Sequence, residues 1–284
     1  MLPKPLALCI FVLVAAAPAS AARRPGDPLK PGFNLFSKQQ DVQLGEANAK
    51  QVLQQYPVVQ NRFLQEYVGR IGARLAEAPE AKQSGFAFTF TVLNVPEINA
   101  FALPGGPMFI YTGLLNACDN EAQLAGVMGH EMSHVILRHG THEATKANFI
   151  QLPAMLASAV IGNEGTMAKL ANMGLGLGAN SFILKFSRDA ESEADALGSR
   201  LMAAGGYDPI QMARFFEKLA QGPQPPQILS DHPNPGNRER AIQSEVQTMT
   251  ARNYTYQTGE FARMKSELKS VPPPPKKASP VPQQ

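Results

Sequence analysis

Cysteine is scarce in this sequence, which limits how the fold can be stabilised. Cys9 and Cys118 are the two cysteines among its 284 residues. Cys9 lies in an N-terminal apolar run that we expect to be removed, so the remaining Cys118 cannot form an intramolecular disulfide. A chain of this length can bury enough apolar surface to fold without covalent cross-links.

A strong excess of one charge is absent as well. The chain has 26 Lys and Arg residues against 23 Asp and Glu residues, and the basic residues are scattered along it. Domains that bind nucleic acid usually carry a clustered basic face, so no nucleic-acid partner is expected. Hydrophobic residues make up 44% of the chain and charged residues 17%, which is typical of a globular protein.

Long uninterrupted apolar runs are also missing. A membrane-spanning helix needs roughly 18 or more such residues. The apolar stretches within 149–184 come closest, but Pro153, Lys169 and several glycines interrupt them. We therefore interpret 149–184 as buried or lid-like helices. We expect no integral membrane span after signal removal, and peripheral membrane association stays open.

The N-terminus has the layout of a cleavable secretory signal peptide. Lys4 precedes the apolar run 6–17, and the small-x-small pattern ASA follows at 19–21. This order of basic, apolar and small residues is typical of signal peptides. We therefore predict that residues 1–21 are a signal peptide and that the protein is exported. The periplasm is preferred to full secretion, although a signal peptide serves both.

Between its two ends, the chain shows the patterning of one α+β domain. No internal repeat and no shift of composition divides residues 41–268. A leader at 22–40 is expected before this domain, and a Pro-rich solvated tail at 269–284 after it. Helical spacing and strand alternation predict two helices within 41–77, a strand within 86–94, two short strands within 98–113, a long helix from about 119, and helices at 188–204, 208–221 and from about 238.

The long predicted helix carries a metal-binding pattern, H-E-x-x-H, at residues 130–134. Residues at i and i+4 lie on the same face of a helix, about one turn apart. Two imidazoles in that arrangement can bind one metal ion, with the glutamate between them beside a water molecule. We therefore predict one metal ion per chain, bound by His130 and His134, with Glu131 beside a metal-bound water.

Two more histidines follow, but the geometry of a continuous helix argues against them as ligands. His139 is nine positions after His130 and would face almost the opposite side, and His142 would lie roughly 18 Å along the axis. The metzincin pattern also fails, because Leu137 and Gly140 stand where it requires glycine and histidine. Neither histidine is predicted to bind the metal unless the chain bends sharply.

A catalytic zinc site still needs a third protein ligand and an open position. The predicted helix 188–204 offers four carboxylates, on Asp189, Glu191, Glu193 and Asp195. Glu191 and Asp195 share a helix face, so one could bind the metal while the other supports a ligand histidine. Spacing alone leaves open whether this segment binds metal or is a solvated acidic face.

The sequence H-E-M-S-H followed by E-S-E-A-D resembles the HtpX/CAAX prenyl endopeptidase family of gluzincin zinc metallopeptidases. In that family H-E-x-x-H is paired with a later E-x-x-A-D motif. The stretches NAFALPGG, RHG and HP are similar too, and the resemblance covers most of residues 41–245. The layout is most similar to the soluble, exported BepA-type branch, without the tetratricopeptide repeats of that branch. The resemblance implies a mainly helical, zincin-type metalloprotease domain with a small β-sheet packed beside the H-E-x-x-H helix.

The resemblance also implies roles for individual residues. His130, His134 and Glu191 would bind one zinc ion per chain, and Glu131 would be the general base. Asp195 would steady a ligand histidine, His130 being the first choice. His232, in the HP motif, would either stabilise the oxyanion or occupy the open position in a latent state. From the residues alone, His232 is more simply interpreted as an ordinary loop histidine.

A final resemblance concerns the substrate. Asn99, Ala100 and Phe101 resemble the family's substrate-binding edge strand, to which an extended peptide adds through backbone hydrogen bonds. This implies a zinc-dependent endopeptidase that hydrolyses extended, unfolded or misassembled envelope proteins in protein quality control. The alternative is a zinc-containing holdase or assembly factor for envelope proteins with little or no proteolysis. The physiological substrate and the oligomeric state stay open.

Overall fold

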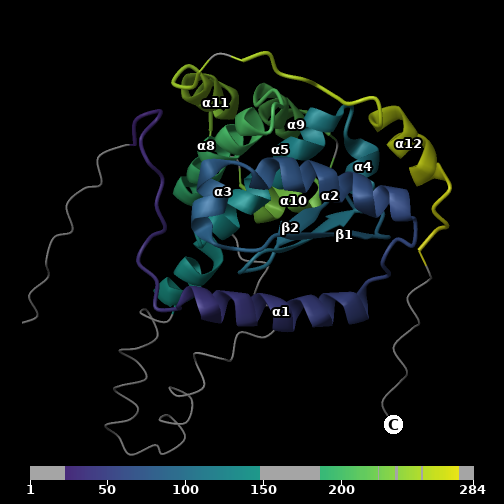
Figure 1. The fold of residues 1–284 in the computed structure, drawn as a ribbon, viewed down its shortest axis with the longest axis horizontal. Helices are drawn as coiled ribbons and strands as arrows, with labels where there is room; N and C mark the ends of the chain where they lie inside the picture. Colours follow the sequence, from purple (N-terminus) through teal and green to yellow (C-terminus); the bar gives the residue numbers. More distant parts are fainter. Residues whose placement is uncertain (1–22, 148–185, 223, 234–235, 251, 275–284) are drawn as a thin grey trace, which may run out of the picture.

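The computed structural model describes residues 23–147, 186–222, 224–233, 236–250 and 252–274. The predicted signal peptide, the apolar region 149–184 and residues 275–284 of the proposed tail lie outside these ranges. The described elements are α1 Lys38–Gln55, α2 Arg62–Ala76, α3 Pro79–Ser84, β1 Thr89–Leu93, β2 Ala100–Ala102, β3 Pro107–Tyr111, α4 Thr112–Ala117, α5 Glu121–Ile136, α8 Arg188–Ala204, α9 Ile210–Ala220, α10 Gln227–Asp231, α11 Arg238–Val246 and α12 Phe261–Lys269. The predicted α+β class is confirmed, because helices dominate and three strands form one small sheet (Figure 1).

The sheet has the strand order β1-β3-β2. β1 runs parallel to β3, and β2 runs antiparallel to it, with Phe101 opposite Phe109. The turn between β2 and β3 contains Gly105 and Gly106, whose φ angles are 82° and 125°. Glycine adopts such positive φ angles at little cost, and this turn returns the chain so that β2 forms one edge of the described sheet.

The two faces of the sheet contact different helices, as the alternation along β3 shows. Met108 and Ile110 join the main core, to which α2 and α5 contribute. Phe109 and Tyr111 point the other way, into a smaller cluster that is covered by residues of α1. The sheet therefore lies between α1 on one side and α2 with α5 on the other (Figure 1).

Helix α5 is the centre of the molecule, because every residue from Glu121 to Ile136 is buried. It packs against the sheet, α2, α8 and α9. Its approach to α8 is close at Gly129 and Gly198, where a Cβ atom on Gly198 would lie 3.1 Å from the backbone nitrogen of His130. Two glycines at this crossing therefore bring the backbones of α5 and α8 close enough for their side chains to share one site.

The structure differs from the sequence expectations mainly at the boundaries. α1 begins at Lys38 rather than at 41, because Ser37 and Gln40 form a capping box that ends the leader earlier. β1 begins at Thr89 rather than at 86. The expected last helix is two helices, α11 and α12, and the short helices α3, α4 and α10 were not predicted.

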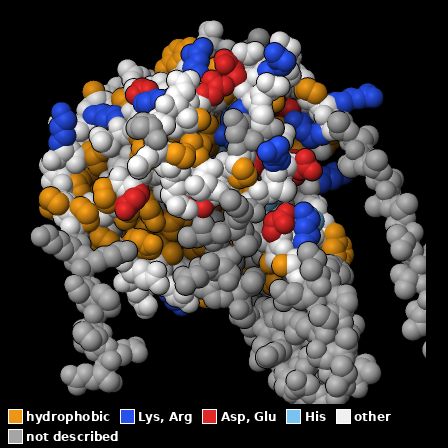
Figure 2. Space-filling view, turned by 180° about the vertical axis from the view of Figure 1, so that it is seen from behind, with side chains coloured by type: hydrophobic (Ala, Val, Ile, Leu, Met, Phe, Trp, Pro, Cys, Tyr) orange, Lys and Arg blue, Asp and Glu red, His pale blue; other side chains and the backbone are white. Residues whose placement is uncertain are grey.

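The described surface carries both charges. On the face shown in Figure 2, basic and acidic side chains are interspersed among apolar ones. Among the residues that the structure describes, no helix is both long and apolar enough to cross a membrane.

Candidate metal centre

Helix α5 supplies the two histidines of the H-E-x-x-H motif. The helix begins after Asn120, whose side chain accepts a hydrogen bond from the backbone N–H of Gln123 and so caps the first turn. In the C-terminal half of the helix, the Nε2 atoms of His130 and His134 lie 3.1 Å apart. Both side chains are buried, so helix geometry alone aims two imidazole nitrogens at one point.

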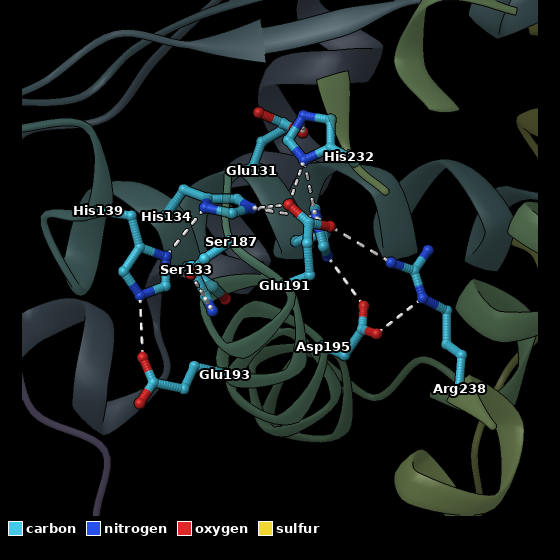
Figure 3. Close-up of polar contacts among 12 residues, drawn as sticks. Glu131, Ser133, His134, His139, Ser187, Glu191, Glu193, Asp195, His232 and Arg238 are labelled. Atoms are coloured by element: carbon cyan, nitrogen blue, oxygen red, sulfur yellow. Dashed lines mark hydrogen bonds and ion pairs between the residues drawn. The ribbon is translucent and has the colours of Figure 1, made fainter. Parts of the chain in front are cut away.

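Helix α8 brings a carboxylate to the same point. Ser187 caps the helix by accepting from the backbone of Ala190, and Glu191 lies in the first turn. One oxygen of Glu191 is 3.3 Å from Nε2 of His130, and the other is 3.4 Å from Nε2 of His134. Of the four acidic residues on α8, the structure therefore places Glu191 with the two histidines (Figure 3).

His232, which follows the short helix α10, is the fourth member of the cluster. Its Nδ1 atom lies 3.2 Å from Nε2 of His130 and 3.0 Å from an oxygen of Glu191. One donor atom from each of His130, His134, Glu191 and His232 lies within 4.8 Å of the others, and all four residues are buried. An ordinary loop histidine would be solvated, so the structure disagrees with that interpretation of His232.

The four donors fit a zinc ion in kind, and the shorter contacts among them also fit it in spacing. Zinc prefers imidazole, carboxylate and thiolate ligands in a tetrahedron, with bonds of about 2.0–2.2 Å, and neighbouring ligand atoms are then roughly 3.3–3.6 Å apart. The contacts of 3.0 to 3.4 Å given above are close to these values, and the whole set lies within 4.8 Å. Three imidazoles and one carboxylate are less suited to magnesium or calcium, which take oxygen ligands.

Asp195 lies behind His130, on the side away from the cluster. Its Oδ1 atom is 3.0 Å from Nδ1 of His130, and its Oδ2 atom is 2.7 Å from Nε of Arg238. Arg238 also lies 3.4 Å from Glu191. This guanidinium, at the first residue of α11, was not assigned a role from the sequence. The weak signal for it was the Arg-containing helix after the HP motif.

His139 lies beside His134, contrary to the position that a continuous helix would give it. α5 ends at Ile136, and Arg138 adopts a left-handed φ of 57°, which bends the chain. The Nδ1 atom of His139 is then 2.9 Å from Nδ1 of His134, on the side away from the donor cluster. His142 lies farther out, with its Nδ1 atom 2.6 Å from the carbonyl oxygen of Phe33.

Glu131 lies at the opening of the site. Its carboxylate oxygen is 3.1 Å from Nε2 of His232, although the geometry is not that of a hydrogen bond. Burial raises the pKa of Glu131, while His232, His130 and a hydrogen bond from the backbone of Ala102 oppose this shift. A buried carboxylate with a raised pKa is suited to exchanging protons near neutral pH.

The cluster is electrostatically coupled before any ion binds. Burial lowers the pKa of His130, but Glu191 and Asp195 outweigh it and raise that pKa to about 9. Burial lowers the pKa of His134 well below its usual value. Burial raises the pKa of Glu191, yet the surrounding imidazoles hold it far below its usual range. The glutamate is therefore ionised, as a metal ligand must be.

A groove leads from the surface to this centre. Its lining includes Asn99 and the edge-strand residues Ala100 and Phe101, together with Val52 of α1 and Tyr56, which follows α1. Residues of the centre line the same groove, namely Glu131, His134 and His232. The residues expected to bind substrate thus share one groove with the expected general base.

Comparisons with known proteins agree with this geometry. The profile of Peptidase family M48 matches residues 63–246. The beta-barrel assembly-enhancing protease of Escherichia coli is 31% identical over 233 residues, which is 79% of this chain and 47% of that protein. The putative beta-barrel assembly-enhancing protease of Vibrio cholerae is 30% identical over 253 residues, 83% of this chain and 52% of that protein.

A mitochondrial protein is similar over a shorter part of the chain. The mitochondrial metalloendopeptidase OMA1 of Arabidopsis thaliana is 33% identical over 169 residues, 59% of this chain and 33% of that protein. The chain therefore spans about half, or less, of the length of the curated relatives it matches.

Proposed function

This chain belongs to peptidase family M48, and from that premise we propose that it is a zinc-dependent endopeptidase. Its substrates would be extended, unfolded or misassembled proteins of the cell envelope. The observation that carries the proposal is that a buried donor set, a glutamate and a groove lie together. Two histidines and a glutamate from α5 and α8 form a buried donor set, and Glu131 lies beside that set in an accessible groove.

We assign His130, His134 and Glu191 as the zinc ligands. A bound zinc ion would polarise the scissile carbonyl and lower the pKa of a water molecule in the site. Glu131 would accept a proton from the attacking water and deliver it to the leaving amine. Its position one residue after His130 on α5, with Ala102 donating to its carboxylate, holds it at the mouth of the site for this transfer.

The groove supports binding of an extended chain. β2 pairs with β3 along one side, and its other edge borders the groove. A peptide that adds to this edge would bond through its backbone, so recognition would tolerate many sequences. Asn99, Ala100 and Phe101 are the proposed contacts, and the side chain of Asn99 currently accepts the N–H of Ala100.

His232 would be a fourth protein ligand and would fill the position that a catalytic zinc site keeps open. Catalytic zinc sites keep one position open, whereas sites with four protein ligands are structural. Because Nδ1 of His232 lies with the other three donors, we propose that this histidine occupies the position of the reacting water. It would have to leave before substrate binds, which makes latency the preferred role over oxyanion stabilisation.

The location and substrates are inferred from the relatives. Two of them carry names that describe enhancement of β-barrel assembly. Together with the predicted signal peptide, this supports an exported protein in the periplasm that acts on envelope proteins. Peripheral contact with a membrane is compatible with the proposal.

In the decisive experiment, the full chain is expressed in a host that exports it, and the mature protein is purified and assayed. We expect about one zinc ion per chain, and cleavage of casein that stops on chelation and returns with added zinc. Glu131→Gln should retain zinc and lose cleavage. A Glu131→Gln protein that still cleaves casein at the wild-type rate would refute the proposal. A zinc-loaded wild type that suppresses aggregation without cleaving would favour a holdase.

A further inference from the structure

We propose that His139 and Glu193 form a positioning relay that holds the ligand histidine His134. The proposal rests on the proposed function, because it assumes that His134 binds zinc. In the relay, Nδ1 of His134 contacts Nδ1 of His139 at 2.9 Å, and Nε2 of His139 contacts an oxygen of Glu193 at 3.1 Å. Figure 3 shows the three side chains in line, leading away from the donor cluster.

The bend after α5 creates this contact, and it is fixed by a separate ion pair. Arg138 adopts a left-handed conformation that is uncommon for residues other than glycine. Its guanidinium pairs with the buried Asp41 of α1 and donates to the carbonyl oxygen of Phe36. The backbone at 138 is therefore held in place, and His139 is turned under the helix against His134.

The protons of the relay can be assigned from the contacts. His134 faces the donor cluster with Nε2, which must be unprotonated to bind a metal, so its Nδ1 carries the proton. Two ring nitrogens at 2.9 Å need one donor and one acceptor, so Nδ1 of His139 accepts. The proton of His139 is then on Nε2, where it is donated to Glu193. One tautomer of each ring satisfies every contact.

The residues around His134 restrict the orientation of its ring. Phe186 stacks on its ring, with centroids 4.0 Å apart and planes inclined by 24°. His139 is 4% exposed, so its imidazole fills the space at Nδ1 of His134 and shields it from water. Partners of this kind fix the orientation and tautomer of a metal-binding histidine, and their loss typically costs 10–100-fold in metal affinity or activity.

The test compares two substitutions of nearly equal size. In His139→Asn, the side-chain oxygen can take the place of Nδ1 and accept from His134, whereas His139→Leu offers no acceptor. We expect His139→Leu to bind zinc about 10–100-fold more weakly than wild type in competition with a chromophoric chelator. His139→Asn should recover most of that loss. A residue that only fills space would give the opposite order or no difference.

A spectroscopic readout follows the proton itself. In the zinc-loaded wild type, the hydrogen-bonded Nδ1–H of His134 should give an imidazole NMR signal shifted downfield, and His139→Leu should remove that shift while the corresponding signal of His130 keeps its position. Equal zinc affinity for the Asn and Leu variants, or an unchanged His134 signal in the Leu variant, would overturn the proposal.

A second test uses Glu193 and needs no substitution in the core. Its side chain is 42% exposed, so Glu193→Ala leaves the core intact. Asp189→Ala on the same helix is the matched control, because Asp189 is exposed and its substitution removes the same charge. We expect Glu193→Ala to weaken zinc binding several-fold, with Asp189→Ala unchanged. Equal affinities for these two variants would also count against the relay.

The outcomes separate the relay from the proposed function. If wild type binds zinc and Glu131→Gln stops cleavage, but His139→Leu binds zinc as tightly as wild type, the relay alone is wrong. If wild type binds no zinc, or if replacing His134 leaves the zinc affinity unchanged, the proposed function itself is wrong.

Discussion

The two sides of the metal centre differ in the elements that form them and in their access to solvent. On the helix side, α5, α8 and α11 place His130, Glu191, Asp195 and Arg238 in contact, each of them at most 3% exposed. On the groove side, α1, the edge strand and His232 surround the opening. The helix side fixes ligands where water cannot compete, and the groove side leaves room for a chain to enter. Substitutions on the two sides should therefore separate zinc binding from turnover.

The largest effect is expected from Glu191→Gln, on the helix side. An amide is a poor zinc ligand, and this substitution also removes the negative charge that the buried imidazoles and Arg238 face. We expect zinc content after desalting to fall from about one per chain to near none, with complete loss of casein cleavage. Elemental analysis would check this, and a zinc-replete Glu191→Gln protein would contradict the assignment.

Asp195→Asn should have the next largest effect, also on the helix side. Oδ1 of Asp195 faces the imidazole Nδ1 of His130, and Oδ2 faces Arg238. An amide must turn its NH₂ group towards one of these two donors. We expect zinc affinity to fall about 10–100-fold, measured by chelator competition. Asp189→Asn, which is exposed on the same helix, is the control and should bind zinc like wild type.

On the groove side, His232→Ala should have a smaller effect and one of opposite sign. Removing a fourth donor opens the position that a catalytic zinc site needs, while three ligands remain on α5 and α8. We expect zinc content to stay near one per chain and casein cleavage to rise several-fold. A fall in cleavage with unchanged zinc would indicate that His232 stabilises the oxyanion instead.

The smallest effect on the site should come from Gly198→Ala, at the crossing of α5 and α8. The added methyl group would lie 3.1 Å from the backbone nitrogen of His130, so the helices must separate slightly. Overpacking of this kind typically costs about 1–3 kcal/mol of stability. Urea unfolding should show that loss, with zinc affinity changed by no more than a few-fold. Gly69→Ala, on α2 with open space around it, is the control.

The part of the site that could be predicted from the sequence is the part that depends on local helix geometry. His130, Glu131 and His134 follow from a spacing of four residues on one helix. Spacing could not choose Glu191 among four carboxylates, because that choice depends on how α8 crosses α5. The resemblance to a known family supplied it.

Long-range and bent features escaped prediction for physical reasons. His139 was placed on the far side of a continuous helix, but the left-handed Arg138 turns it against His134. Arg238 gives no periodic signal, since its role depends on a helix that returns from more than 40 positions away. In the fold, the long helices and the alternating strands were predicted, whereas helices of five or six residues have too few turns to show a pattern.

The most direct test of the account is the position of the metal itself. Crystals of the zinc-loaded Glu131→Gln protein, measured on both sides of the zinc absorption edge, would locate the ion by its anomalous signal. We expect one peak between Nε2 of His130, Nε2 of His134 and the carboxylate of Glu191. A peak elsewhere, or one that excludes Glu191 from the ligands, would contradict it.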